Sequence, residues 1–199
     1  KLIISSGHDE YWSLNERNKF ENARAAGVHL AFFSGNEVYW KVRYENSNRT
    51  LVCYKEGTLG ENVCGNKCDP TSAWTGLWRD GAAYDAGKPE NGLTGQISWS
   101  DVGSAISVPA AYKNLRFWRN TSVASLAAGA TATLGSSTLG YEWDFVQYTE
   151  SYPSGYIPLS STTVSGKEHR LSLYRHPSGA LVFGSGTVQW AWGLDNIHD

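Results

Sequence analysis

The chain has 199 residues, a formal net charge of −2 and 41% hydrophobic residues. The length and apolar content fit one domain with a sizeable core. The near-neutral charge argues against electrostatic binding to nucleic acid or to an acidic membrane surface. No apolar run approaches the length of a membrane-spanning helix.

The first elements along the chain form a strand–helix–strand unit. Residues 2–5, LIIS, predict a fully buried strand because they are apolar, rich in β-branched residues and soon followed by glycine. Ser13 and Glu16 have the spacing of a capping box, so we expect a helix that begins there and stops at Gly27. Residues 28–34, VHLAFFS, predict a second buried strand. This pattern indicates a βαβ unit of a parallel sheet.

Polar and aromatic residues gather directly after both predicted strands. Residues 7–12 read GHDEYW and residues 35–40 read GNEVYW. Parallel strands end at the same edge of a sheet, and open α/β sheets bind their ligands at that edge. The sequence therefore predicts that the chemistry of this domain lies where these two loops meet.

The rest of the chain is expected to contain mostly strands and loops. Residues 51–55, LVCYK, predict a strand, and residues 56–95, rich in Gly, Asn, Asp and Pro, predict a loop-rich insertion within a single domain of residues 1–199. Further strand patterns follow in QISW, LRFWRN, ATATLG, LSLYR and ALVFGSG. HPSG at 176–179 predicts a hairpin turn, and TVQWAWGLD at 187–195 predicts a short helix.

The chain contains three cysteines, Cys53, Cys64 and Cys68. A structural zinc site needs four ligands, and no second pair is present. We expect a Cys64–Cys68 disulfide in a secreted or extracellular protein, with Cys53 as a buried strand thiol. Pairing with Cys53 remains an alternative.

Six stretches, in order, resemble the C-terminal domain of the N,N-dimethylformamidase large (beta) subunit. They are GHDEYWS, GVHLAFFSGNEVYWKVR, NRTLVCYKE, WTGLWRD, LGYEWD and SGALVFGSGTVQWAWGLD. The resemblance covers nearly all of the chain. It implies an α/β fold, a three-layer flavodoxin-like sandwich similar to class I glutamine amidotransferases, with a β-rich insertion.

The resemblance also carries two expectations about what the chain lacks. The SGNEVYW turn has no cysteine or serine placed as an elbow nucleophile, so cysteine-based amidotransferase chemistry is not expected. Domains of this family begin with a strand and a helix before the first strand seen here. We therefore expect an upstream segment or a partner chain to complete the sheet beside residues 2–5.

The same resemblance implies a ferric iron, Fe(III), bound by Tyr11, Tyr39 and Glu142. Phenolate and carboxylate oxygens are hard anionic donors that suit a hard trivalent cation. Three protein ligands leave open positions for water and a small-molecule substrate. The residue two positions before Glu142 is Gly140, so no histidine accompanies this glutamate. That departure argues against formamide hydrolysis itself but does not argue against the metal.

Two neighbouring residues are candidates for proton transfer. His8 can exchange a proton beside the metal because the ordinary pKa of imidazole is about 6.5, or it can be a structural residue bonded to a nearby loop. Glu37 can be a general base or an acceptor for the backbone of its own turn. The resemblance, taken with these two residues and the three metal ligands that it implies, predicts a metal-dependent hydrolase acting on an amide or other C–N bond.

Two alternatives stand beside this hypothesis. One is a non-catalytic carbohydrate- or partner-binding module of an exported protein. The other is an inactive structural descendant of the enzyme fold. Metal content separates the enzyme from both.

Overall fold

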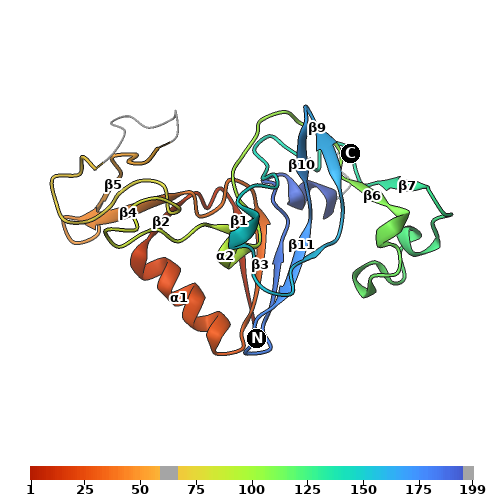
Figure 1. The fold of residues 1–199 in the computed structure, drawn as a ribbon, viewed down its shortest axis with the longest axis horizontal. Helices are drawn as coiled ribbons and strands as arrows, with labels where there is room; N and C mark the ends of the chain where they lie inside the picture. Colours follow the sequence, from red (N-terminus) through yellow and green to blue (C-terminus); the bar gives the residue numbers. More distant parts are fainter. Residues whose placement is uncertain (59–66, 195–199) are drawn as a thin grey trace.

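The computed structural model describes residues 1–58 and 67–194 as a mixed α/β fold built on one central sheet (Figure 1). The five strands of this sheet lie in the order β1 (Leu2–Gly7), β3 (His29–Ser34), β12 (Leu181–Gly184), β11 (Ser172–Arg175) and β8 (Ile157–Pro158). The first three strands are parallel, and β11 and β8 each run antiparallel to their neighbour. The predicted parallel βαβ unit and the 176–179 hairpin are confirmed.

The helix α1 (Leu14–Ala25) follows its sequence signals closely. The Ser13 side chain accepts a hydrogen bond from the Glu16 backbone, and the Glu16 side chain accepts from the Ser13 backbone, which completes the predicted capping box. Gly27 follows the helix with φ of +83°, a left-handed conformation that glycine adopts without steric cost. Phe20 packs α1 onto one face of the sheet, against Trp12 and Phe32.

Three smaller sheets surround the central one. The first contains β2 (Tyr11–Ser13), β4 (Trp40–Glu45) and β5 (Thr50–Val52). The others pair β9 (Thr162–Val164) with β10 (Lys167–His169), and β6 (Ser107–Pro109) with β7 (Thr131–Thr133). The remaining helices are short: α2 (Asn91–Thr94) and the 3₁₀ turns η1 (Ala110–Tyr112), η2 (Arg116–Trp118), η3 (Ser122–Ser125), η4 (Thr149–Ser151) and η5 (Trp190–Leu194). None of the helices in the described residues is long and apolar enough to cross a membrane.

Two main apolar clusters form the core. The cluster on the α1 side of the sheet contains Trp12, Leu30, Phe32, Val38, Trp78, Leu93, Tyr174 and Val182. The cluster beyond the opposite face contains Ile106, Val108, Trp118, Val123, Leu139, Trp143, Leu159 and Leu171. The second cluster packs the loop-rich residues 106–143 against the sheet, because Leu173 of β11 and Phe183 of β12 contact it.

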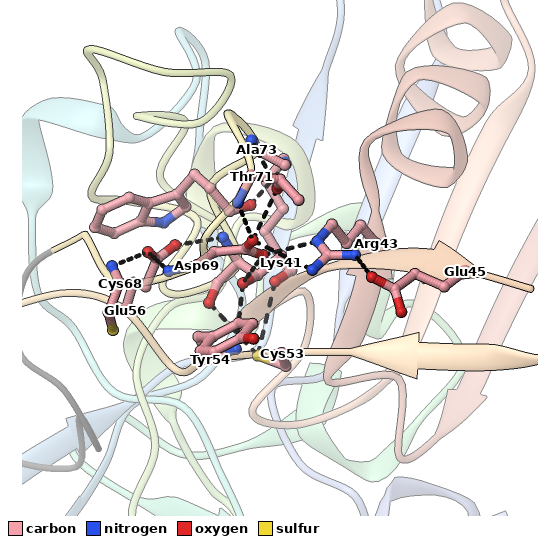
Figure 2. Close-up of polar contacts among 12 residues, drawn as sticks. Lys41, Arg43, Glu45, Cys53, Tyr54, Glu56, Cys68, Asp69, Thr71 and Ala73 are labelled. Atoms are coloured by element: carbon pink, nitrogen blue, oxygen red, sulfur yellow. Dashed lines mark hydrogen bonds and ion pairs between the residues drawn. The ribbon is translucent and has the colours of Figure 1, made fainter.

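A dense polar network holds the segment after residue 66 against β4 and β5 (Figure 2). The buried carboxylate of Glu56 accepts hydrogen bonds from Lys67 and from the backbone amides of Asp69 and Thr75. Asp69 in turn accepts from the Arg43 guanidinium on β4. Polar contacts therefore order residues 67–73, which carry few apolar side chains and precede the buried Trp74.

Several sequence predictions need correction. The strand β1 is not fully buried: it lies at the edge of the described sheet, and Leu2 and Ile4 are 55% and 52% exposed. Residues 96–99 form a loop, and residues 116–118 form η2, because Trp118 turns inward and donates its Nε1–H to the Leu159 carbonyl at 2.9 Å. The tertiary contact overrides the strand propensity of these aromatic residues.

The predicted three-layer α/β sandwich is only partly supported. Among the described residues, α1 is the one α-helix longer than a single turn, so the mixed α/β class is confirmed and the three-layer flavodoxin-like sandwich is not. The described residues of 56–95 form loops, isolated bridges and α2. They fit the loop-rich description of the insertion rather than the β-rich one.

Candidate functional site

The loops that follow β1 and β3 meet at one edge of the sheet, as the sequence predicts. The register pairs Gly7 with Ser34, so both strands end at the same level. Beyond the strands, the Val38 amide donates to the Asp9 carbonyl at 3.1 Å, and the Trp40 amide donates to the Glu10 carbonyl at 2.8 Å. These bonds continue into the parallel β2–β4 pair and fix the two loops against each other.

Residues 140–144 reach the same edge from a distant part of the chain. The Asp144 amide donates to the Gly186 carbonyl at 2.8 Å, and the Asn36 amide donates to Asp144 Oδ1 at 3.1 Å. Gly35 allows this approach, because a Cβ at this position would lie 2.6 Å from the Glu142 carbonyl oxygen. The predicted ligand Glu142 is therefore brought beside the two predicted loops.

The loop after β3 has an unusual backbone. Asn36 and Val38 have φ of +52° and +55°, in the left-handed region. A β-branched residue such as Val38 rarely adopts this conformation, which costs on the order of 1–3 kcal/mol. Strain of this kind is typical of loops whose shape serves a site rather than stability.

At the solvent-facing part of this edge, the imidazole of His8 lies beside the side chains of Tyr141 and Glu142. The His8 side chain is 52% exposed, and its Nδ1 lies 3.6 Å from Glu142 Oε2. Its Nε2 lies 3.1 Å from the Tyr141 hydroxyl, and the two rings are in contact. Glu142 Oε2 is itself buried and has no hydrogen-bond partner. His8 and Glu142 thus form one unit, with the imidazole accessible to solvent.

Glu10 adds a second carboxylate to this edge. Its pKa is raised by burial and then by the nearby negative charge of Glu142, while Lys55, Tyr11 and Trp40 act in the opposite direction. Burial likewise raises the pKa of the Tyr11 phenol, ahead of the effect of Glu10, and contact with Lys55 opposes the shift. Tyr11, Glu10 and Glu142 therefore share one electrostatic neighbourhood.

Lys55 is a site residue that the sequence analysis missed. Its ammonium lies 5.9 Å from the centroid of the Tyr11 ring and 5.0 Å from that of the Trp40 ring. A lysine shortly after a short strand carries no distinctive pattern. Only the folded chain places this cation beside Glu10 and Tyr11.

The second predicted tyrosine ligand, Tyr39, lies deeper than Tyr11. Tyr39 is 3% exposed, whereas Tyr11 is 37% exposed. The guanidinium carbon of Arg79 lies 5.0 Å from the centroid of the Tyr39 ring, and Arg79 is held by an ion pair with the buried Glu90. Arg79 was also missed as a site residue by the sequence analysis, although it lies in the WTGLWRD stretch of the family resemblance, because nothing in that stretch links it to the strand-end loops.

Glu37, the predicted general base, lies in the interior and not at the exposed surface. It is 2% exposed, and both of its carboxylate oxygens lack a hydrogen-bond partner. Burial raises the pKa of Glu37 well above its usual range, and the charges of Asp144 and Asp9 act in the same direction. Burial also raises the pKa of Asp144 well above its usual range; the hydrogen bond from the Asn36 amide opposes this shift, and the charges of Glu90 and Asp9 add to it. The loops thus enclose two buried carboxyl groups, Glu37 and Asp144, in addition to the exposed cluster around His8.

The metal and cysteine predictions have limited support from the described residues. Within residues 1–58 and 67–194, no group of three or more His, Cys, Asp and Glu side chains is arranged to hold a metal ion. The set that contains Tyr11 and Tyr39 remains a prediction. Cys53 is a free thiol, and Cys64 lies outside the described residues, so the Cys64–Cys68 disulfide also stays a prediction.

Comparison with known proteins identifies the family. The family model described as N,N-dimethylformamidase beta subunit-like, C-terminal, matches residues 1–199, which is the whole chain. A search of curated proteins found no match. The family match agrees with the resemblance carried by the two strand-end loops and by residues 139–144. The chain belongs to the N,N-dimethylformamidase beta subunit-like, C-terminal family and is a hydrolase-related domain.

Proposed function

We propose that this domain is a metal-dependent hydrolase that acts on an amide or other C–N bond. In this proposal Tyr11, Tyr39 and Glu142 bind Fe(III), and His8 transfers protons. The observation that carries the proposal is the buried Glu142 Oε2, which has no hydrogen-bond partner although it lies at the edge of the sheet where the site loops meet.

The residues of this edge fit a hard cation. A buried carboxylate oxygen without a donor is costly, and a bound cation satisfies it. The negative charge of Glu142 adds to burial in raising the pKa of Glu10, so a trivalent ion at this edge would meet nearby negative charge that it can neutralise. The three ligands are oxygen donors of the type that hard trivalent ions prefer. The loops of Tyr11 and Tyr39 are joined by backbone pairing, since Tyr11 is opposite Trp40 in the β2–β4 register.

The protein groups supply the proton chemistry. A bound Fe(III) would act as a Lewis acid on the substrate carbonyl or on a water molecule. His8 is solvent-accessible and is oriented between the Tyr141 hydroxyl and Glu142. It is therefore placed to take a proton from the attacking water and to return it to the departing nitrogen. We assign this role to His8 rather than to Glu37, because the His8 side chain is 52% exposed whereas Glu37 is 2% exposed.

Metal analysis of purified protein tests the proposal, provided that no chelator is used. We expect close to one iron per chain and a visible absorption from tyrosinate-to-iron charge transfer. Tyr39→Phe should reduce both, and so should Glu142→Gln. The matched control is Tyr44→Phe, which removes the hydroxyl of a tyrosine that is 44% exposed on β4 and should change neither.

Hydrolase activity should depend on the bound iron. N,N-dimethylformamide is the first substrate to assay, by release of dimethylamine, followed by other small amides. His8→Ala should lower turnover by about 10²–10⁴-fold while the iron content stays normal. Colourless wild-type protein with stoichiometric iron would reject the tyrosine ligands. Protein that takes up no metal would favour the non-catalytic module.

A further inference from the structure

A groove of about 620 Å³ lies at the end of the central sheet where β8 borders β11. Its apolar floor is formed by Leu173 of β11, Leu181 of β12 and Ile157 of β8. Tyr174 and Val182 alternate with the floor residues along β11 and β12 and belong to the core cluster on the α1 side, so the floor faces away from α1. The volume lies within the range of small-molecule sites, about 300–1,000 Å³.

The groove lies where the short strand β8 stops. β8 pairs with β11 only at Ser172 and Leu173, and Gly155, which precedes β8 and lines the groove, brings no side chain. Toward the middle of the sheet, Leu173 and Phe183 pack against the second core cluster. Ile157, by contrast, is 41% exposed. The open apolar surface is therefore a local patch at this end of the sheet.

Phe117 of η2 forms one wall of the groove. Its ring stacks on that of Phe183, with the centroids 5.5 Å apart and the planes 10° from parallel. The neighbouring Trp118 anchors η2, because its Nε1–H donates to the Leu159 carbonyl at 2.9 Å. Phe117 is nevertheless 39% exposed. The core thus holds this wall in place while part of its aromatic surface stays open to a ligand.

The border of the groove is basic, because Arg116, Arg119 and Arg175 all line it. In the described part of the chain, none of these three guanidinium groups has a carboxylate within ion-pair distance. The surrounding sequence supplies no anion either, since residues 102–141 contain Lys113, Arg116 and Arg119 but no Asp or Glu. Cations beside an apolar floor complement a ligand with an anionic head group and an apolar body.

We propose that this groove binds a small amphiphilic carboxylate, with its head group on the arginines and its alkyl chain on the apolar floor against Phe117. Guanidinium groups hold carboxylates through paired hydrogen bonds. Arg175 and Leu173 lie two positions apart on one face of β11, so about 7 Å separates the basic border from the floor. A medium-chain monocarboxylate such as octanoate reaches both. The proposal does not depend on the catalytic function or on its metal.

Isothermal titration calorimetry of the purified protein with octanoate tests the proposal. Acetate carries the same head group without the chain, and octylammonium carries the same chain with the opposite charge. We expect octanoate to bind at least about tenfold more tightly than either. Octanoate binding should also weaken as the salt concentration rises, because the arginines lie at the exposed border of the groove.

Charge variants test the role of the arginines. Arg116→Gln combined with Arg175→Gln should weaken octanoate binding at least about tenfold. The matched control is Lys19→Gln combined with Arg49→Gln, which removes two exposed positive charges that lie outside the groove. The control should leave octanoate binding unchanged.

A floor variant tests the apolar part of the groove. Ile157→Asp places a carboxylate where the alkyl chain lies and should weaken octanoate binding at least about tenfold. Leu51→Asp makes the same kind of change at a residue that is 47% exposed on β5 and should have no effect. Circular dichroism and thermal unfolding of each variant establish that it is folded.

Several results would overturn the proposal. They are no binding of octanoate at millimolar concentration, equal binding of octanoate and octylammonium, or octanoate binding that the Arg116 and Arg175 double variant leaves unchanged. Phosphatidylglycerol vesicles that bind through these arginines, in the absence of octanoate binding, would assign the patch to a membrane surface instead. An acidic peptide that behaves in this way would assign it to a protein partner.

Discussion

Replacing Glu56 with glutamine should lower the free energy of unfolding by about 3–5 kcal/mol, although the change removes no atoms from the core. Glu56 is fully buried. One carboxylate oxygen accepts from Lys67 Nζ at 3.1 Å and from the Asp69 amide at 2.7 Å, and the other accepts from the Thr75 amide at 2.7 Å. The carboxylate therefore joins the chain that follows β5 to residues 67–75 through polar contacts (Figure 2).

The size of the effect follows from the donors that glutamine cannot satisfy. Glutamine keeps one acceptor oxygen and replaces the other with an NH₂ group. If that oxygen stays with Lys67 and Asp69, the NH₂ group faces the Thr75 amide, donor against donor. A buried donor left unsatisfied costs about 1–3 kcal/mol, and each charge-assisted bond that becomes neutral loses about 1 kcal/mol or more.

Urea unfolding followed by tryptophan fluorescence measures this prediction. Glu45→Gln is the matched control, because Glu45 also forms an ion pair, here with Arg43, but its side chain is 46% exposed. The control should cost less than about 1 kcal/mol. Hydrogen exchange in Glu56→Gln should quicken first at the Asp69 and Thr75 amides. A loss below about 1 kcal/mol for Glu56→Gln would show that the network does not hold this segment.

Three further predictions follow from single features. Gly35→Ala should destabilise the fold by about 1–3 kcal/mol in urea unfolding, because the new Cβ would lie 2.6 Å from the Glu142 carbonyl oxygen; an unchanged midpoint would mean that the two loops separate freely. Burial lowers the pKa of His169 to about 4, below its unfolded value of about 6.5. Protonation therefore favours the unfolded chain, so the free energy of unfolding is highest above about pH 6.5 and decreases as the pH falls toward 4. Urea unfolding across this window should show that slope, and His169→Phe should remove it; an identical slope in the variant contradicts the assignment. Finally, protein from an oxidising source should give one reactive thiol under denaturing conditions, because we expect Cys64 and Cys68 to be paired; three thiols would exclude the bridge.

The sequence by itself determined the local elements of this protein. Its capping box, the left-handed Gly27 after α1 and the HPSG hairpin all depend on residues within a few positions of each other, so their signals are complete in short stretches. The pairing of β1 with β3 also followed, because a βαβ unit with short loops has few alternatives. The same argument placed the loops of His8 and Tyr39 at one edge of the sheet.

Only the tertiary structure decided how distant segments complete the site. Residues 140–144 approach Gly35, and β12 is inserted beside β3, through contacts between residues more than a hundred positions apart. Lys55 and Arg79 reach Tyr11 and Tyr39 across shorter separations, of 44 and 40 positions, which no short pattern records either. The exposure of β1 likewise could not be predicted from the apolar pattern of residues 2–5. Such a pattern indicates that a strand can be buried, but not which neighbours cover it. Burial and long-range approach depend on how the whole chain packs, which no short pattern encodes.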